Sequence, residues 1–154
     1  MLNIFLFVHL LSVVIWVGSI MFFSFCAAPA IFKVLEREKA GEVIGVIFPR
    51  YWLVGYVCGI VGVLSLILIA AYGGGFLPLR FILVLLMMVL GFYSGLVVGR
   101  KAREIKSDIK ASTDDAEKER LRGRFKKVHA KSAILNMVTL AIGIVVVYLI
   151  AITL

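Results

Sequence analysis

Residues 3–32 read NIFLFVHLLSVVIWVGSIMFFSFCAAPAIF, without a single Asp, Glu, Lys or Arg. A helix rises about 1.5 Å per residue, so this stretch can cross the roughly 30 Å of bilayer hydrocarbon with length to spare for tilt. Three further apolar stretches cover residues 51–72, 79–99 and 133–154. They are continuously apolar and do not alternate as the strands of a membrane β-barrel do. The sequence therefore predicts an all-α integral membrane four-helix bundle.

Composition supports this class and limits what else the chain can contain. Hydrophobic residues make up 62% of the 154 residues, and the mean hydropathy is +1.08. A soluble domain with this composition would expose a large apolar surface. We therefore expect one transmembrane domain over residues 1–154, with no separate catalytic domain. The first apolar stretch has no Lys or Arg before it and exceeds the length of a secretion signal, so we expect it to be retained as a helix.

Charge is confined almost entirely to two connections between the spans. The chain has 17 Lys and Arg against 9 Asp and Glu, and all of these except Arg80 lie within residues 33–50 and 100–131. This distribution indicates orientation in a membrane and not nucleic-acid binding. The positive-inside rule places both basic loops in the cytoplasm and both termini outside it, which suits a multi-pass protein of the bacterial cytoplasmic (inner) membrane. Arg80 lies near a helix end and is expected to extend to the outer surface.

The longer basic loop has a helical pattern of its own. Ala102, Ile105 and Ile109 keep helical spacing, and capping residues follow from Ser112 to Asp115. We therefore expect the third and fourth helices to project into the cytoplasm as a charged helical hairpin that turns near Ser112. The alternative is a merely solvated run of charges.

The shorter basic loop suggests a separate surface element. Residues 38–48 suit a short amphipathic helix at the membrane surface, with Ile44 and Phe48 facing lipid or the bundle. Pro49 is expected to start the second transmembrane helix, because the first turn of a helix does not need the N–H that proline lacks. Arg50 and Trp52 would then lie at headgroup depth.

Polar residues follow one face of the first span and one face of the fourth. On the first span they are spaced alternately three and four apart, and on the fourth the spacing is similar. Polar groups in lipid turn inward, so both faces are expected to line the bundle interior. The alternative for each hydroxyl or amide is a hydrogen bond that joins helices. The two faces comprise His9, Ser12, Trp16, Ser19, Phe23 and Cys26, and His129, Ser132, Asn136, Thr139 and Gly143.

His9 is the strongest candidate for a ligand-binding residue. It lies inside a span with no acidic residue in any span to pair with it, and a neutral imidazole can ligate haem iron or copper. With Ser12 and Trp16 it would line a cofactor site that opens toward the outer leaflet and could hold haem b, with His9 as the metal ligand. Only Arg80 is available there to meet haem propionates, which counts against haem. The alternative is a buried histidine that hydrogen-bonds a neighbouring helix.

Other residues offer weaker functional hypotheses. Cys26 and Cys58 lie at similar depth and could form a soft Cu(I) site with nearby methionines, although ordinary packing of these side chains is favoured. No Asp, Glu, Lys or Arg lies deep in a span, which argues against proton-coupled transport. Glycines four residues apart permit close helix packing, either inside a monomer or across a homodimer or larger membrane complex. The glycines are Gly55 and Gly59, with Gly62 three residues on, and Gly91, Gly95 and Gly99; the methionines are Met21, Met87, Met88 and Met137.

Several short runs, in order along the chain, carry a family resemblance. They are His9-Leu10-Leu11-Ser12, Trp16-Val17-Gly18, Ala28-Pro29, Ala40-Gly41, Phe48-Pro49-Arg50-Tyr51, and Phe125, His129, Ser132 and Asn136. With these runs the chain resembles the transmembrane protein 205-like family, a bacterial membrane domain of unknown function, and is more distantly similar to the membrane domain of copper resistance protein D. A looser similarity to the membrane protoporphyrinogen oxidase implies only a stronger case for His9 as a haem or metal ligand.

Two functional hypotheses follow. The first is a non-enzymatic bundle that binds a small ligand, haem or a metal, or that serves as an accessory subunit of a membrane complex. The second is a membrane oxidoreductase acting on a porphyrin or quinone, with haem at His9. Under either hypothesis, the composition directly predicts one partner of the protein, the lipid bilayer.

Overall fold

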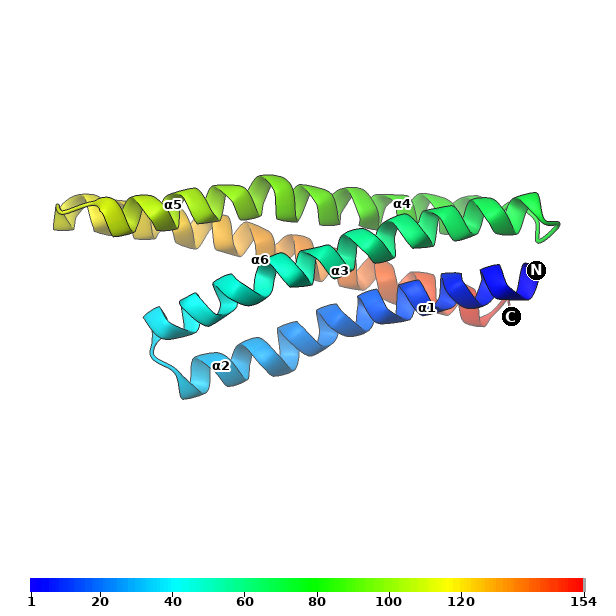
Figure 1. Ribbon diagram of the computed structural model, residues 1–154, viewed down its shortest axis with the longest axis horizontal. Helices are drawn as coiled ribbons and strands as arrows, with labels where there is room; N and C mark the ends of the chain where they lie inside the picture. The colour runs from blue at the N-terminus through cyan, green and yellow to red at the C-terminus, as the bar shows by residue number, and fades with distance from the viewer. Residues whose placement is uncertain (154) are drawn as a thin grey trace.

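Four long helices form the molecule in the computed structural model, which describes residues 1–153 (Figure 1). All four are long and apolar enough to cross a membrane, and the described residues contain no strand. The predicted all-α four-helix membrane bundle is therefore confirmed. In chain order the elements are α1 (Leu2–Met21), the π-helical segment η1 (Phe22–Ala27), α2 (Ala28–Val34), α3 (Arg37–Ala71), α4 (Pro78–Phe92), the π-helical segment η2 (Tyr93–Val98), α5 (Gly99–Ala111) and α6 (Asp115–Ala151).

The two ends of the bundle differ in sequence and in packing. Both termini and the glycine turn between α3 and α4 lie together at one end, which we call the terminal end (Figure 1). Gly73 and Gly75 adopt φ values of 88° and 75° in that turn, a conformation that favours glycine. The turns at residues 35–36 and 112–114 form the other end, which we call the charged end. Near the terminal end the helices pack in the cyclic order α1, α3, α4 and α6.

Toward the charged end the bundle divides into two hairpins. There α2 packs on α3 and α5 packs on α6, and the two pairs diverge (Figure 1). The loop expected to be a charged helical hairpin is confirmed as one: α5 ends at Ala111, and Asp114 caps α6 by accepting from the Ala116 N–H at 3.1 Å.

The glycine faces are used for packing within the chain. A Cβ built on Gly59 would lie 3.0 Å from Met88, and one on Gly55 would lie 3.1 Å from the Trp16 indole nitrogen. At Gly99 a Cβ would overlap the Trp52 ring. The sequence allowed these glycines to pack helices inside a monomer or across a homodimer, and the structure shows packing inside the monomer. The side chains opposite Gly55 and Gly59 fill the space beside them, so no room is left there for a flat ligand.

The prediction that residues 38–48 form a separate surface helix, and that Pro49 starts the next one, is wrong. Residues 37–71 form one continuous helix with Pro49 inside it. Proline removes one hydrogen bond from a helix interior, but burial of Ala40 and Ile44 holds the N-terminal part of α3 in place. The Arg50 Nη1 group donates to the Val46 carbonyl at 3.0 Å, which adds a side-chain bond next to the interruption.

Two side chains also point differently from the predictions. Arg80 does not extend to the surface: it is 4% exposed, and its guanidinium donates to the Leu149 carbonyl at 2.7 Å and to the Thr153 hydroxyl. The last carbonyls of α6 carry partial negative charge, so they attract this cation. Cys26, expected on the inward face, is exposed. It lies in η1, where the wider π-helical turn changes the three-and-four spacing that placed it inward.

Candidate functional sites

His9 lies in a polar contact between α1 and α3. Its Nδ1 atom is 3.2 Å from the Gly62 carbonyl oxygen and 3.1 Å from Ser65 Oγ, and the side chain is 1% exposed. The Ser65 hydroxyl donates to the Gly62 carbonyl at 2.9 Å, so its oxygen can accept from an Nδ1–H. Ser12 donates to the carbonyl of His9 at 2.8 Å. These bonds suit the tautomer with its proton on Nδ1 and a lone pair on Nε2.

The Nε2 atom of His9 is buried without a hydrogen-bond partner among the described residues. Such an atom is costly to bury, and an imidazole anchored at Nδ1 is the usual form of a metal-ligating histidine. The donor is therefore suitable for a metal or haem iron. The surroundings are not suitable for haem, because Val13, Val84 and Met87 are each at most 2% exposed and fill the core around this level.

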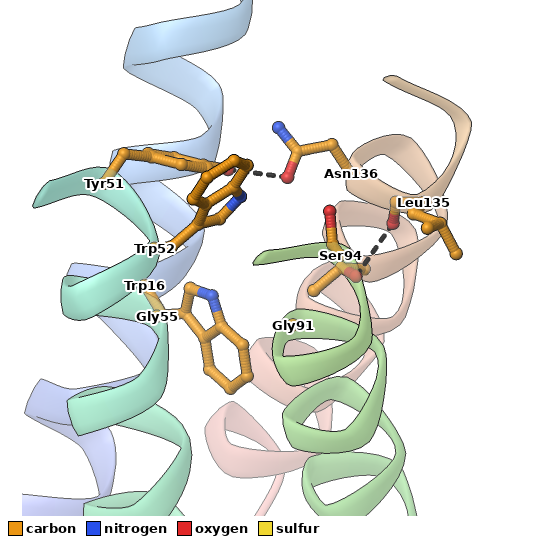
Figure 2. Close-up of a pocket in the computed structure, with 9 residues that line it drawn as sticks. Trp16, Tyr51, Trp52, Gly55, Gly91, Ser94, Leu135 and Asn136 are labelled. Atoms are coloured by element: carbon orange, nitrogen blue, oxygen red, sulfur yellow. Dashed lines mark hydrogen bonds between the residues drawn. The ribbon is translucent and has the colours of Figure 1, made fainter. Parts of the chain in front are cut away.

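Trp16 lines a small cavity nearer the charged end than His9. The cavity has a volume of about 20 Å³, which suits a single water molecule. Figure 2 shows the Trp16 ring below Tyr51 and Trp52, facing Gly91 and Ser94 across the gap. His9 and Ser12 are not among its lining residues. The structure therefore does not gather the three predicted residues into one site: the Ser12 hydroxyl bonds only to the backbone carbonyl of His9 one turn earlier, and Trp16 lies at a separate void.

The inward face of α6 is confirmed in part. Asn136 accepts from the Tyr51 hydroxyl at 2.7 Å (Figure 2), and Thr139 and Gly143 are buried. Toward the charged end the face turns outward, because His129 is exposed and stacks on Phe125 with ring centroids 6.1 Å apart. Among residues 1–153 no group of three His, Cys, Asp or Glu side chains is placed to hold a metal, and Cys58 is buried whereas Cys26 is exposed.

A larger groove, wide open to the surroundings, lies between α3 and α5 at the charged end. We call it the basic cleft. It has a volume of about 460 Å³. α3 forms one wall and α5 the other, and its lining residues are Glu42, Gly45, Arg103, Lys106, Ser107 and Lys110.

The basic cleft holds three cations and one carboxylate. The Lys110 ammonium lies 3.5 Å from Glu42 in an exposed ion pair. The Lys106 ammonium donates to the Gly41 carbonyl at 3.0 Å, and the Arg103 guanidinium lies over the Trp52 ring, 5.6 Å from its centroid. Two of the three cations thus have neutral partners, and the cleft is electropositive. Sequence reasoning missed it, because it depended on α3 continuing through Pro49 to lie opposite α5.

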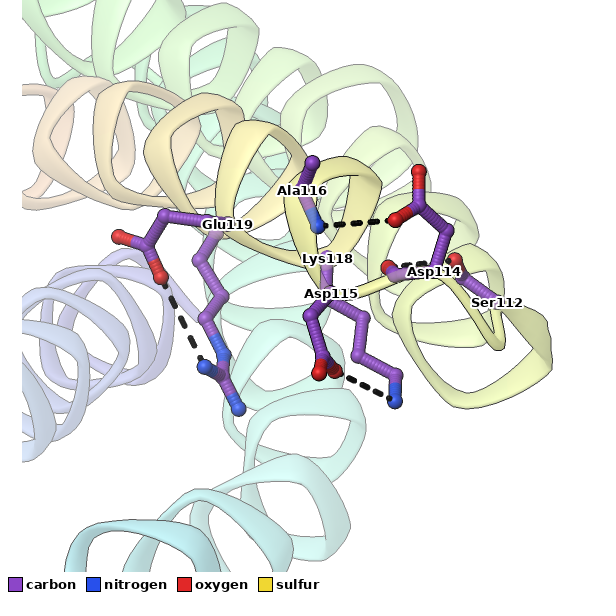
Figure 3. A network of polar contacts seen from close by, with 7 residues as sticks. Ser112, Asp114, Asp115, Ala116, Lys118 and Glu119 are labelled. Atoms are coloured by element: carbon purple, nitrogen blue, oxygen red, sulfur yellow. Dashed lines mark hydrogen bonds and ion pairs between the residues drawn. The ribbon is translucent and has the colours of Figure 1, made fainter.

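The turn beyond the basic cleft is built differently. Its cations are paired locally: Lys118 lies 3.4 Å from Asp115, and Arg122 lies 3.6 Å from Glu119 (Figure 3). The Arg120 guanidinium makes two bonds of 2.8 Å to Glu117, so Glu117 does not complete a capping box with Asp114. Local pairing leaves this part of the charged end less electropositive than the cleft.

Comparison with known proteins identifies a family whose function is unknown. A family model described as a domain of unknown function (DUF4149) matches residues 11–111. An uncharacterized protein of Aquifex aeolicus is 43% identical over 83 residues, which cover 54% of this chain and 59% of that protein. The match thus spans less than two thirds of the relative. No solved structure matches the chain. The comparisons support a bacterial family of unknown function and do not confirm the resemblance to the transmembrane protein 205-like family or to copper resistance protein D.

Proposed function

We propose a role from the geometry of this chain, which belongs to the DUF4149 family of unknown function. It is a non-enzymatic membrane module, alone or as an accessory subunit of a larger membrane complex, and it binds an anionic group in the basic cleft. The observation that carries the proposal is the excess of cations over carboxylates in the lining of the basic cleft. Three cations, Arg103, Lys106 and Lys110, line the cleft against one carboxylate, Glu42. Arg103 and Lys106 contact a neutral aromatic ring and a backbone carbonyl, and the pair between Lys110 and Glu42 is exposed.

The interior of the bundle supports a binding role over a reaction. The inward polar groups on α1, α3 and α6 mostly bond to one another or to backbone, as His9 does with Ser65 and Tyr51 with Asn136. The cavity beside Trp16 has room for water and not for a porphyrin or quinone. An oxidoreductase would need an interior site of several hundred cubic ångströms for such a substrate.

The orientation is part of the same proposal. The positive-inside rule assigns the charged end to the cytoplasm and the terminal end to the outside of a bacterial inner membrane. The basic cleft then lies at the cytoplasmic surface. A membrane-impermeant thiol reagent applied to intact cells should label Phe76→Cys, at an exposed position in the turn between α3 and α4, and not Asp115→Cys, in a background lacking Cys26 and Cys58. The reverse labelling would overturn this orientation.

Binding can be tested with a soluble anion. We expect pyrophosphate, added at constant ionic strength to protein in neutral detergent, to raise the melting temperature by about 2–4 °C. The double variant Arg103→Gln/Lys106→Gln should lose this increase. The control Lys126→Gln/Lys127→Gln removes two exposed cations from α6, outside the cleft, and should keep it. An equal increase in all three proteins would contradict a site in the cleft.

A second candidate function rests on the unpartnered Nε2 of His9. In it the Nε2 atom of His9 ligates a metal ion, whereas haem iron would require the packed core to open. Ser12 lies one helical turn from His9, and Trp16 lines a separate void. Purified protein from haem-replete cells would then show a Soret band or a stoichiometric metal, and His9→Gln would remove it. Colourless and metal-free protein would leave His9 as a packing residue and would also exclude the haem-based oxidoreductase.

A further inference from the structure

We infer that the anionic group of the basic cleft is the phosphate of an anionic glycerophospholipid from the cytoplasmic leaflet. This inference rests on the proposed function and on its orientation. A free phosphate compound has the same charge chemistry, so the depth of the cleft must decide between the two sources.

Three basic residues indicate where the lipid phosphates lie along the helices, and hence how deep the basic cleft is in the membrane. Arg50 on α3, Arg100 on α5 and Lys131 on α6 are each about 30–33 Å along their helices from the terminal end. This length equals the hydrocarbon thickness of a bilayer, and cations at such a position meet the lipid phosphates. Lys131 also donates to the Tyr93 hydroxyl at 2.6 Å, so an interfacial aromatic accompanies it.

An aromatic cluster lies at the same level, where the two hairpins part. Phe48 stacks on Trp52 with centroids 5.0 Å apart, and Phe23 packs on Phe48 at 5.2 Å. Tryptophan at this depth is typical of the headgroup layer. The Arg103 guanidinium lies over Trp52, about one helical turn beyond Arg100. The floor of the basic cleft therefore begins within the headgroup layer and continues outward to Lys106 and Lys110.

The contacts that now occupy these cations can be exchanged for a phosphate. The ion pair between Lys110 and Glu42 is exposed, with side-chain exposures of 65% and 57%, and such pairs are weak. Lys106 donates to a carbonyl that carries no net charge. A phosphate diester entering from the leaflet would meet Arg103 first and Lys106 next. Each cation near an anionic membrane surface typically strengthens binding about fivefold.

Tryptophan quenching measures this preference directly. The full chain is reconstituted in phosphatidylcholine vesicles that contain phosphatidylglycerol, with bromine on the chains of one lipid or the other. Trp16→Phe leaves Trp52 as the reporter, since the chain has two tryptophans. We expect brominated phosphatidylglycerol to quench Trp52 with at least a fivefold binding preference over brominated phosphatidylcholine. Arg103→Gln/Lys106→Gln should bring the preference close to one, while Lys126→Gln/Lys127→Gln should retain it.

The outcomes separate the inference from the proposed function. Equal quenching by the two lipids, together with stabilisation by pyrophosphate, would mean that the cleft binds a soluble anion and that the lipid assignment is wrong. Equal quenching without stabilisation would overturn both. A preference that survives in the cleft variant would also overturn the lipid site. Should that variant fail to fold, the wild-type preference measured in 0.05 and 0.5 M salt decides, since a charge-based site loses most of it at the higher concentration.

Discussion

The terminal half and the charged half of the bundle differ in how closely their helices pack and in how their charged groups are paired. In the terminal half, α1, α3, α4 and α6 all pack together, and His9 Nδ1 and the Arg80 Nη2 group bond to partners inside the protein, whereas His9 Nε2 and Arg80 Nε have none among the described residues. In the charged half, two hairpins diverge and long basic side chains span the space between them. The comparison teaches that the terminal half is held by close packing, and that cations without carboxylate partners are concentrated in the charged half.

The junction of the two halves should be the most sensitive to added volume. Gly99→Ala places a methyl group into the Trp52 ring, whereas Gly18 has nothing within 4 Å of a built Cβ. We expect Gly99→Ala to lower the free energy of unfolding by about 1–3 kcal/mol, because overpacking displaces a rigid aromatic ring and backbone. Gly18→Ala is the matched control and should change stability little. Thermal unfolding in detergent would measure both, and equal effects would contradict the packing at the junction.

The two histidines offer a direct contrast between the halves. His9 is 1% exposed and bonded to α3, whereas His129 is exposed on α6. His9→Ala should cost about 2–3 kcal/mol through a cavity and lost hydrogen bonds, and His129→Ala should stay within about 0.5 kcal/mol. Comparable losses in the two variants, measured by denaturant titration in mixed micelles, would show that the terminal half is not the better packed one.

The hydrogen bond between Tyr51 and Asn136 tests a weaker link across the bundle. Its length is 2.7 Å, and bonds of this kind in membranes are worth about 0.6 kcal/mol and seldom more than about 2 kcal/mol. We expect Tyr51→Phe and Asn136→Leu each to lower the free energy of unfolding by an amount in this range. The double variant should lose less than their sum, because both remove one bond. Strictly additive losses would mean that the two side chains do not interact.

The ion pair at the cleft should have the smallest effect on stability and a visible effect on binding. Glu42→Gln removes the exposed pair with Lys110, so the unfolding free energy should change by less than about 1 kcal/mol. It also removes the only carboxylate that lines the basic cleft in the described part of the chain. The preference for phosphatidylglycerol should therefore rise. A fall in that preference would assign Glu42 a positive role in binding.

The sequence predicted most of the fold because hydrophobic length and charge placement are local signals. Four spans, the charged hairpin near Ser112 and the inward position of Asn136 all followed from them. It failed at Pro49, where tertiary burial of Ala40 and Ile44 carries the helix through a residue that usually begins one. It also failed at Cys26, because a π-helical turn shifts the helical register. Arg80 turned inward because the end of α6 offered carbonyls that sequence spacing cannot place.

The candidate site was harder to predict than the fold. His9 was recognisable as a lone histidine in a span, and a hydrogen bond to a neighbouring helix was among the alternatives, although Ser65 as the partner was not predicted. The basic cleft was not recognisable, because its walls are about 60 residues apart in the chain and meet only when α3 is continuous. Ordinary solvated charge and a binding surface have the same composition, so only their spatial pairing separates them.

Hydrogen exchange measured by mass spectrometry, on the full chain in neutral and in anionic nanodiscs, tests the contrast between the two halves most directly. In phosphatidylcholine we expect slow exchange around His9 and Ser65 and faster exchange in residues 37–48 and 99–111. Replacing part of that lipid with phosphatidylglycerol should slow exchange in residues 37–48 and 99–111 clearly more than in residues 112–131, despite the many cations in the latter segment. Equal slowing across residues 99–131, or none in residues 99–111, would contradict a specific anionic-lipid site between the hairpins.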